Sequence, residues 1–247
     1  MQTTPSVRRQ STALAVLIGC TALAHSHASA TTQKSVPAPA FDIVETDIRV
    51  DREQRWMVFS MKVKGKAGKE RPTRKGAFAG ADVFSYVWPT RIDPFDVGFD
   101  HDAGTLALAV TIHPDFDDTP LFATTGADWH THWVVLVPDE VCGKGALKVQ
   151  DIPEGSKPRL PKTWPGVPLL IDSPGYAPRF TGPSVSVRVP FDDAGRVLDQ
   201  AFDGVTAGLR INASAHSPLL CVVNVFDVQS GDLSLPQRVT AKATPTP

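Results

Sequence analysis

The sequence predicts an all-β fold: an antiparallel β-sandwich, formed by a single domain and covered by a long proline-rich segment. Three observations support this prediction. Apolar and polar residues alternate with period two over many short segments, turn-forming residues separate these segments, and no helical periodicity extends beyond one short stretch. Short strands at turn spacing are typical of two packed antiparallel sheets.

The first strands are predicted from alternation and from the turns between them. Residues 41–50 and 56–63 flank the turn-forming residues 51–54, so we expect a hairpin. Residues 64–78 are basic and glycine-rich and indicate a loop. The next strand is predicted over residues 82–88.

Residues 105–113 alternate most regularly, after a turn signal at residues 100–104. The large apolar side chains that face one way are Leu106, Leu108, Val110 and Ile112. The side chains that face the other way are Ala107, Ala109, Thr111 and His113. An acidic loop, residues 114–127, leads to the following strand.

The second half of the chain begins with proline-rich residues 150–183. Their proline density excludes a long helix or a central strand and favours an extended covering segment, with an edge strand over residues 167–171. The remaining predicted elements are strands at 184–189, 204–211 and 219–228 and one short helix at 196–202.

The N-terminus is typical of an export signal. Arg8 and Arg9 precede an apolar run at residues 13–24 that is too short to span a bilayer, and an Ala-x-Ala site predicts cleavage after Ala30. Two alternatives remain: a lipobox that would leave a lipid anchor at Cys20, and cleavage after Ala24.

These boundaries predict four segments: a signal peptide (1–30), a flexible linker (31–40), a β-sandwich domain (41–239) and a flexible tail (240–247). The mature chain has no further apolar stretch long enough to cross a membrane, so we expect a periplasmic or secreted protein. Cleavage after Ala30 removes two arginines and no acid, which changes the formal net charge from −1 to −3. An acidic balance gives no support for a nucleic-acid partner.

Two cysteines, Cys142 and Cys221, remain after this cleavage. An even pair in an exported chain predicts one disulfide, with two buried thiols as the alternative.

Trp129-His130-Thr131-His132-Trp133 is the most informative motif. It runs directly into an apolar stretch at residues 134–137, which predicts a strand. Residues two apart on a strand share a face, so the two imidazoles lie roughly 6.5–7 Å apart along it. Two histidines on one face of a rigid strand form half of a metal site, although core or surface histidines are the alternative.

A third ligand is predicted from antiparallel pairing. If the strands on either side of the acidic loop pair, His113 and His130 lie at the same end, and His113 can share the face of His130 and His132. Three imidazoles with an open fourth position are a recognised Zn²⁺ arrangement. The row of Ala107, Ala109 and Thr111 beside them is small enough to leave room for a ligand.

Acidic residues near the same end are candidate fourth ligands or acceptors that orient an imidazole. Asp128 has the strand parity of His130 and His132 and is the weaker member of the predicted metal site. Asp115, Asp117 and Asp118 come from the acidic loop. His101 is placed at the far end of the His113 strand and is not expected to join, and His216 is an unfavoured candidate.

Several stretches resemble a family of bacterial exported proteins that includes cyanobacterial proteins secreted under zinc limitation. The resemblance lies in residues 106–122 (LALAVTIHPDFDDTPLF), 129–138 (WHTHWVVLVP), 165–176 (PGVPLLIDSPGY), 202–209 (FDGVTAGL) and 224–228 (NVFDV). It implies a zinc-binding β protein with His130 and His132 as ligands. His130-x-His132-Trp133 is also similar to the His-x-His-Trp strand of α-class carbonic anhydrases, but the chain lacks a clear Thr–Glu pair to gate a zinc-bound hydroxide.

The predicted function is therefore an exported zinc buffer, chaperone or carrier that exchanges metal with a transporter or an envelope metalloprotein, because the histidines come without an identifiable general base. Three alternatives stay open. Copper is favoured by imidazole ligands and by a His25-Ser26-His27 end after cleavage at Ala24. A zinc hydrolase or hydratase would use metal-bound hydroxide. A metal-free ligand-binding sandwich is the last.

Overall fold

The computed structural model describes residues 38–72, 82–113, 128–212, 214 and 218–242, and it confirms the predicted all-β, antiparallel fold. The predicted signal peptide with its alternative processing sites lies outside these residues. So does the acidic loop from residue 114 to 127.

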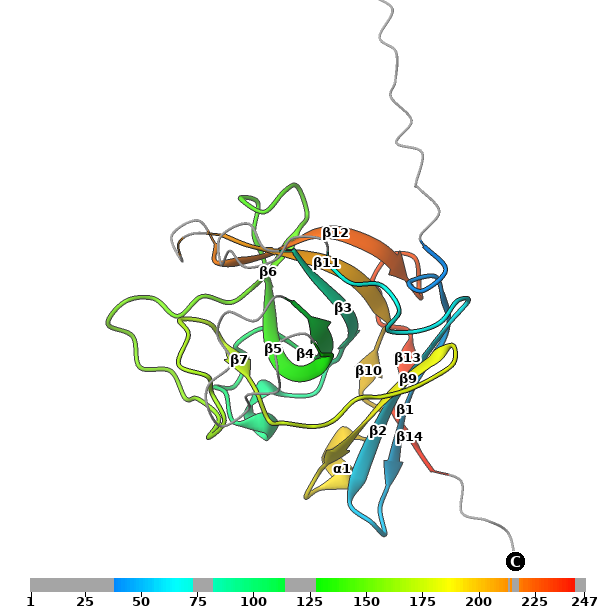
Figure 1. The fold of residues 1–247 in the computed structure, drawn as a ribbon. Helices are drawn as coiled ribbons and strands as arrows, with labels where there is room; N and C mark the ends of the chain where they lie inside the picture. The colour runs from blue at the N-terminus through cyan, green and yellow to red at the C-terminus, as the bar shows by residue number, and fades with distance from the viewer. Residues whose placement is uncertain (1–37, 73–81, 114–127, 213, 215–217, 243–247) are drawn as a thin grey trace, which may run out of the picture. The chain divides into compact units, whose positions relative to one another are not determined.

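Six antiparallel strands close into a barrel. They are β3 (Asp82–Pro89), β4 (Thr105–Ile112), β5 (His130–Pro138), β6 (Leu147–Val149), β11 (Val205–Ile211) and β12 (Leu220–Val228). Their order is β4-β3-β11-β12-β6-β5, and β5 pairs back with β4, so the ring has no free edge at that point. Figure 1 looks into this ring. The two-residue strand β7 (Ile171–Asp172) pairs with β5 on the edge that β6 also uses.

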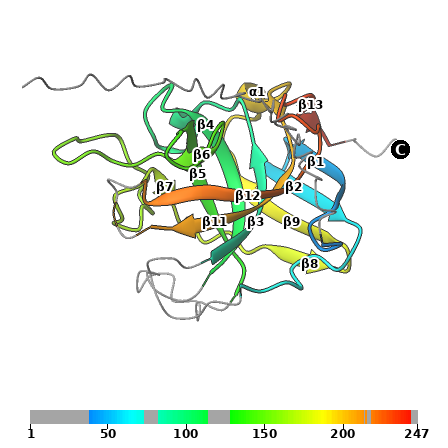
Figure 2. The same cartoon turned by 90° about the horizontal axis from the view of Figure 1, so that it is seen from above.

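A second sheet lies beside the barrel (Figure 2). Its order is β14 (Thr240–Ala241), β1 (Ile43–Asp51), β2 (Trp56–Val63), β9 (Ser184–Pro190) and β8 (Arg179–Thr181). The predicted hairpin is present, because β1 and β2 pair antiparallel with Asp51 opposite Trp56. β14 pairs parallel to β1 and consists of two residues that the sequence assigns to the tail.

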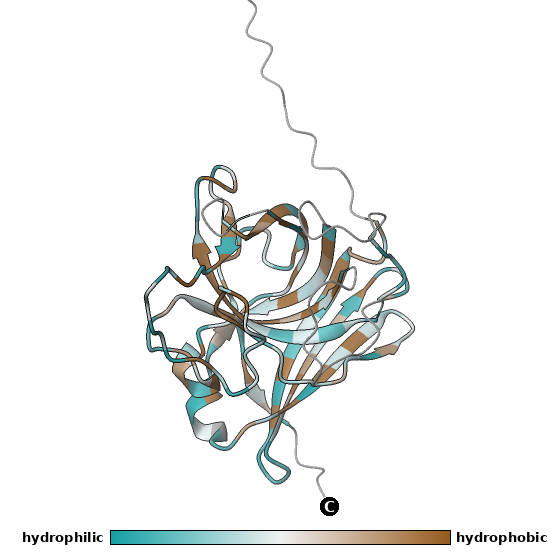
Figure 3. Cartoon of the chain, turned by 60° about the vertical axis from the view of Figure 1, so that its left-hand side comes forward, coloured by the Kyte–Doolittle hydropathy of each residue, from teal (hydrophilic) through white to brown (hydrophobic). Residues whose placement is uncertain are grey.

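Hydrophobic and hydrophilic residues alternate along the strands (Figure 3), and this period-two alternation produces two separate apolar cores. The first lies between the second sheet and the outer wall of the barrel, where Phe59 and Met61 meet Trp88, Leu108 and Trp133. The second lies inside the barrel and contains smaller side chains such as Ala107, Ala109, Val134, Ala207 and Leu209. The first core holds the two sheets together, and the second surrounds the barrel axis.

The predicted sandwich thus has its two packed layers, but one layer closes into a barrel. Closure depends on β6, which bridges β5 and β12 with a few pairs. The β6–β12 pair, in which Lys148 lies opposite Cys221, joins residues that are distant in sequence, and no local pattern predicts it.

The predicted helix over residues 196–202 is wrong in position. A single helical turn, α1 (Ala194–Val197), covers only the first two residues of the predicted range, and β10 (Ala201–Phe202) pairs with β13 (Gln237–Arg238) instead of continuing the helix. Phe202 is 1% exposed, so burial of this ring and pairing with a distant strand outweigh the local helical preference. A short 3₁₀ turn, η1 (Pro94–Val97), lies between β3 and β4.

The remaining connections tie the barrel together. Cys142, in the β5–β6 turn, and Cys221, in β12, form the predicted disulfide, with Cα atoms 5.4 Å apart. The proline-rich segment lies along the edge of β5 through the pairing of β7, and a bridge between Asp151 and Leu169 joins two parts of the segment itself. Within the described ranges, no helix has the length and apolar character needed to cross a bilayer.

Candidate metal centre

The pairing of β4 with β5 brings the three predicted histidines together. Thr111 lies opposite His130 and Ala109 lies opposite His132, and His113 follows directly after β4. One ligand nitrogen from each of His113, His130 and His132 lies within 4.8 Å of the other two. We call this group the histidine cluster.

Two tryptophans hold β5 from its other face. Trp133 is 1% exposed and meets the ring of Phe59 edge to face, with ring centroids 5.7 Å apart. Trp129 is also buried, and its indole nitrogen donates to the main-chain carbonyl of Gly68 at 3.0 Å. Because side chains alternate along a strand, burial of these rings in the first core turns His130 and His132 toward the barrel interior.

His132 is the most constrained ligand candidate. It is 7% exposed, and its Nδ1 lies 3.1 Å from the main-chain carbonyl oxygen of Asp172 and 3.1 Å from Oγ of Ser173. A carbonyl oxygen can only accept, so Nδ1 carries the proton and Nε2 carries the lone pair. This contact selects the tautomer that a metal needs at Nε2.

His130 is fixed in the same way. Its Nδ1 donates to the main-chain carbonyl of Asp128 at 2.9 Å, which leaves Nε2 as an acceptor. That Nε2 lies 2.8 Å from Nε2 of His113 and 3.4 Å from Oγ1 of Thr111. Since His130 Nε2 accepts, His113 donates in this arrangement, and a metal ion would replace the shared proton.

The spacing fits a tetrahedral ion after small side-chain rotations. Zn–N bonds of about 2.0–2.1 Å at tetrahedral angles place ligand nitrogens about 3.3 Å apart. The 2.8 Å separation between His113 and His130 must therefore widen by about 0.5 Å, and the longest separation, up to 4.8 Å, must shrink. The rings of His113 and His132 flank that of His130, each at nearly a right angle to it.

Electrostatics keep His132 in its ligand form. Burial, then the charges that His130 and His113 would carry, hold the pKa of His132 well below its ordinary value of 6.5. Burial also raises the pKa of the neighbouring Asp172 carboxyl, whose Oδ1 accepts from Thr163 Oγ1 at 2.6 Å. His132 is therefore neutral at pH 7, as metal binding requires.

The other predicted residues do not join the cluster within the described part of the chain. Asp128 is exposed, and its main-chain carbonyl, not its carboxylate, contacts His130. Asp115, Asp117, Asp118 and His216 lie outside the described residues. His101 lies elsewhere, with Nδ1 2.7 Å from Asp93 and its ring stacked on Phe95 at 3.9 Å.

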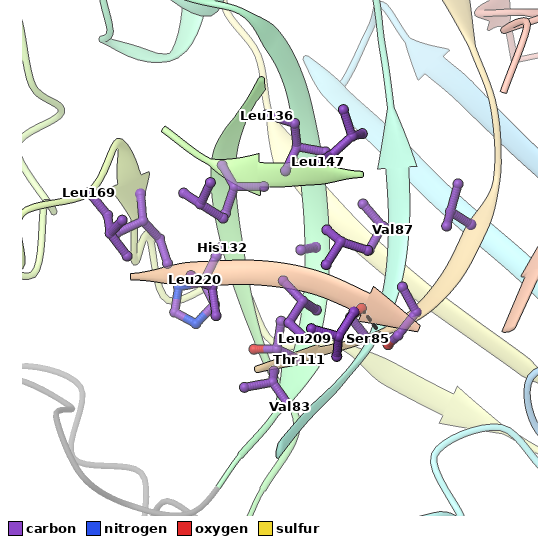
Figure 4. Close-up of a pocket in the computed structure, with 18 of the residues that line it drawn as sticks. Val83, Ser85, Val87, Thr111, His132, Leu136, Leu147, Leu169, Leu209 and Leu220 are labelled. Atoms are coloured by element: carbon purple, nitrogen blue, oxygen red, sulfur yellow. Dashed lines mark hydrogen bonds between the residues drawn. The ribbon is translucent and has the colours of Figure 1, made fainter. Parts of the chain in front are cut away.

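A cavity of about 470 Å³ fills the barrel beside the cluster, and His113 and His132 form part of its wall. Figure 4 shows His132 on one side of this cavity and Val87 on the other. The remaining wall is almost entirely aliphatic. Of the small residues that predicted this space, Ala109 and Thr111 line it and Ala107 does not. Nothing local indicated that Ser173 and Asp172 would contact His132.

Comparison of the chain with protein-family models, with curated proteins and with solved structures finds no match. The resemblance to exported zinc-limitation proteins therefore stays a prediction.

Proposed function

We propose that this chain is an exported zinc-binding protein, which holds Zn²⁺ through His113, His130 and His132 and acts as a zinc buffer, chaperone or carrier. The proposal rests on the histidine cluster, in which two imidazoles donate a hydrogen bond from Nδ1 to a main-chain carbonyl and so keep the lone pair of Nε2 available to a metal. Zinc accepts three imidazoles and an open fourth position, which suits a protein that hands metal to a transporter or an envelope metalloprotein.

Isothermal titration of the mature chain with Zn²⁺ at pH 7.5 tests this function. We expect about one ion per chain, and loss of that binding in His130→Ala/His132→Ala. The His101→Ala variant is the matched control, since His101 lies outside the cluster and should bind zinc normally. Affinity should weaken below about pH 6, where imidazoles take up protons. Absence of binding at pH 7.5 would refute the proposal.

Three imidazole ligands suit more than one metal ion. Imidazole donors also bind Cu²⁺, which ranks above Zn²⁺ in intrinsic affinity. Elemental analysis of protein purified without chelator or affinity tag should find zinc, and copper in its place would favour the copper-binding alternative.

Export is supported by the disulfide between Cys142 and Cys221, because such bonds persist in oxidising compartments. Mass spectrometry of the mature protein should give an N-terminal Thr31. A lipid-modified Cys20 would instead indicate an anchor, and an N-terminal His25 would create a copper chelate.

A zinc hydrolase or hydratase is the second candidate, and the cavity beside the open metal position favours it. Metal-bound hydroxide could form there near neutral pH. Zinc-loaded protein should then hydrolyse esters or hydrate CO₂, and both activities should disappear in His130→Ala/His132→Ala. If the zinc-loaded protein has neither activity, or if both activities persist in His130→Ala/His132→Ala, the hydrolase is ruled out and the carrier function remains.

A further inference from the structure

We infer that the barrel cavity binds an aliphatic carboxylate, whose head occupies the open position on the metal and whose hydrocarbon tail fills the barrel. This inference rests on the proposed function, because the head needs the metal ion. The inference adds an organic ligand, an aliphatic carboxylate, to the metal ion that storage or transfer of zinc needs.

The cavity is larger than the space that a closely packed barrel interior leaves open. Interiors of folded proteins are close-packed, and small barrels are usually filled by their own side chains. Here about 470 Å³ stays open, which lies within the range of small-molecule pockets. The cause is visible in the sequence, since the inward positions of three strands carry side chains as small as Ser85, Ala109 and Ala207.

The distribution of polar groups also favours such a ligand. Ser85 donates to the main-chain carbonyl of Ala207 at 2.9 Å, so its hydroxyl is already bonded. The other polar side chains of the wall are Thr111, His113, His132 and Ser173 near the cluster, and Lys144 in the β5–β6 turn. Aliphatic residues make up nearly all of the rest, so the polar groups gather at the histidine cluster, Lys144 is exposed in the turn beyond the other end of β5, and the body of the cavity is apolar.

The charge of a bound metal ion favours an anionic ligand. Three neutral imidazoles leave a bound divalent ion with its full double charge, and the described wall of the cavity contains no aspartate or glutamate. The nearby Asp172 carboxylate bonds to Thr163 and does not line the cavity. A cation in an apolar surrounding gains most from an anionic fourth ligand, and a carboxylate on an apolar chain satisfies both ends of the cavity.

The wild-type protein provides the first test. Zinc-loaded chain is titrated calorimetrically with acetate, hexanoate, octanoate, decanoate and dodecanoate, and with decanol as the neutral control of equal tail. We expect affinity to rise about fourfold per added methylene until the tail fills the cavity, and then to level off. Decanoate should bind at least about tenfold more tightly than decanol, and the metal-free protein should lose this preference.

Cobalt substitution gives a readout at the metal. Carboxylate bound as a fourth ligand changes the visible spectrum of Co²⁺, whereas a tail bound elsewhere does not. We expect decanoate to shift the spectrum and decanol to leave it unchanged.

A variant separates the cavity from the metal. Val87→Phe adds bulk on the side of the cavity opposite His132, and should weaken decanoate binding at least about tenfold while zinc binding stays normal. Val44→Phe, at an exposed position of β1, is the matched control and should change neither. If Val87→Phe does not fold, the chain-length series on the wild type still decides the question.

The outcomes distinguish the two proposals. Normal zinc binding with decanoate no tighter than acetate or decanol overturns this inference and leaves the zinc-binding function intact. Decanoate affinity that does not change in a folded Val87→Phe protein also overturns it. Absence of zinc binding overturns both.

Discussion

The ring nitrogens of His130 and His132 that face away from the cluster donate to main-chain carbonyls, and these single contacts determine which nitrogen can bind a metal. A carbonyl is fixed by the backbone, so the tautomer does not depend on a mobile side chain. His132 has the additional contact with Ser173, which makes it the better-held ring.

Removing the Ser173 hydroxyl should therefore weaken zinc binding. We expect Ser173→Ala to lower zinc affinity by about tenfold. This is the lower end of the usual effect of removing a hydrogen-bond partner of a ligating histidine, because the carbonyl of Asp172 still holds the ring. Competition titration with a zinc chelator measures this. Ser186→Ala, in β9 of the second sheet, is the matched control, and equal affinity in both variants would contradict the prediction.

Burial of His132 should make the metal-free protein less stable in acid. Burial lowers the pKa of His132 in the folded state. At pH values between that lowered pKa and 6.5, the unfolded chain therefore binds a proton at this imidazole and the folded chain does not. Stability is then full above pH 6.5 and falls as pH decreases, by at most about 1.4 kcal/mol per pH unit for one proton.

Urea unfolding of metal-free protein between pH 5.5 and 7.5 measures this dependence. His132→Asn should flatten it, because the buried imidazole is then absent. An unchanged slope in His132→Asn would contradict the assignment.

At the scale of elements, the β4–β5 pair does most to form the site. Its two faces have opposite roles: Trp129 and Trp133 fill the core between the sheets, and the histidines face the barrel. A shift of one residue in this pairing would exchange the faces, so the packing of the tryptophans also fixes the register of the metal ligands.

Trp133→Ala should consequently destabilise the fold strongly. Removal of a fully buried indole against Phe59 should cost about 3–5 kcal/mol, through lost burial and the cavity left behind. Denaturant unfolding gives the number. Trp56→Ala, at a half-buried position of β2, should cost less, and an equal loss would show that Trp133 has no special role.

At the scale of the whole molecule, barrel closure depends on few contacts. The three-residue strand β6 pairs with β12 through Cys221 opposite Lys148, and the disulfide reinforces the same junction. The β5–β6 turn also contributes Lys144, Gly145 and Ala146 to the cavity wall. The disulfide therefore supports the cavity as well as the fold.

Loss of the disulfide should lower global stability. Cys142 and Cys221 are 79 residues apart, and cross-linking a loop of that size stabilises a chain by about 4.5 kcal/mol in the chain-entropy treatment. We expect Cys142→Ser/Cys221→Ser to lose about 2–4.5 kcal/mol in denaturant unfolding. Reduction of the wild type should give the same midpoint as the double variant, and an unchanged midpoint after reduction would argue against a bond in solution.

The sequence by itself determined the longer strands, their alternation and the shared face of His130 and His132, because each follows from residues that are neighbours in the chain. The strand at 56–63 has its predicted bounds, and His113 meets His130 because adjacent strands pair by default.

Tertiary structure alone decided the closure of the barrel, the strand at Ala201–Phe202 where a helix is predicted, and the contact of Ser173 with His132. Each depends on residues that are distant in sequence, whose pairing is set by burial of the whole chain and leaves no local pattern. The cavity combines both sources: small side chains made it possible, and closure of the barrel lined it with residues from its six strands.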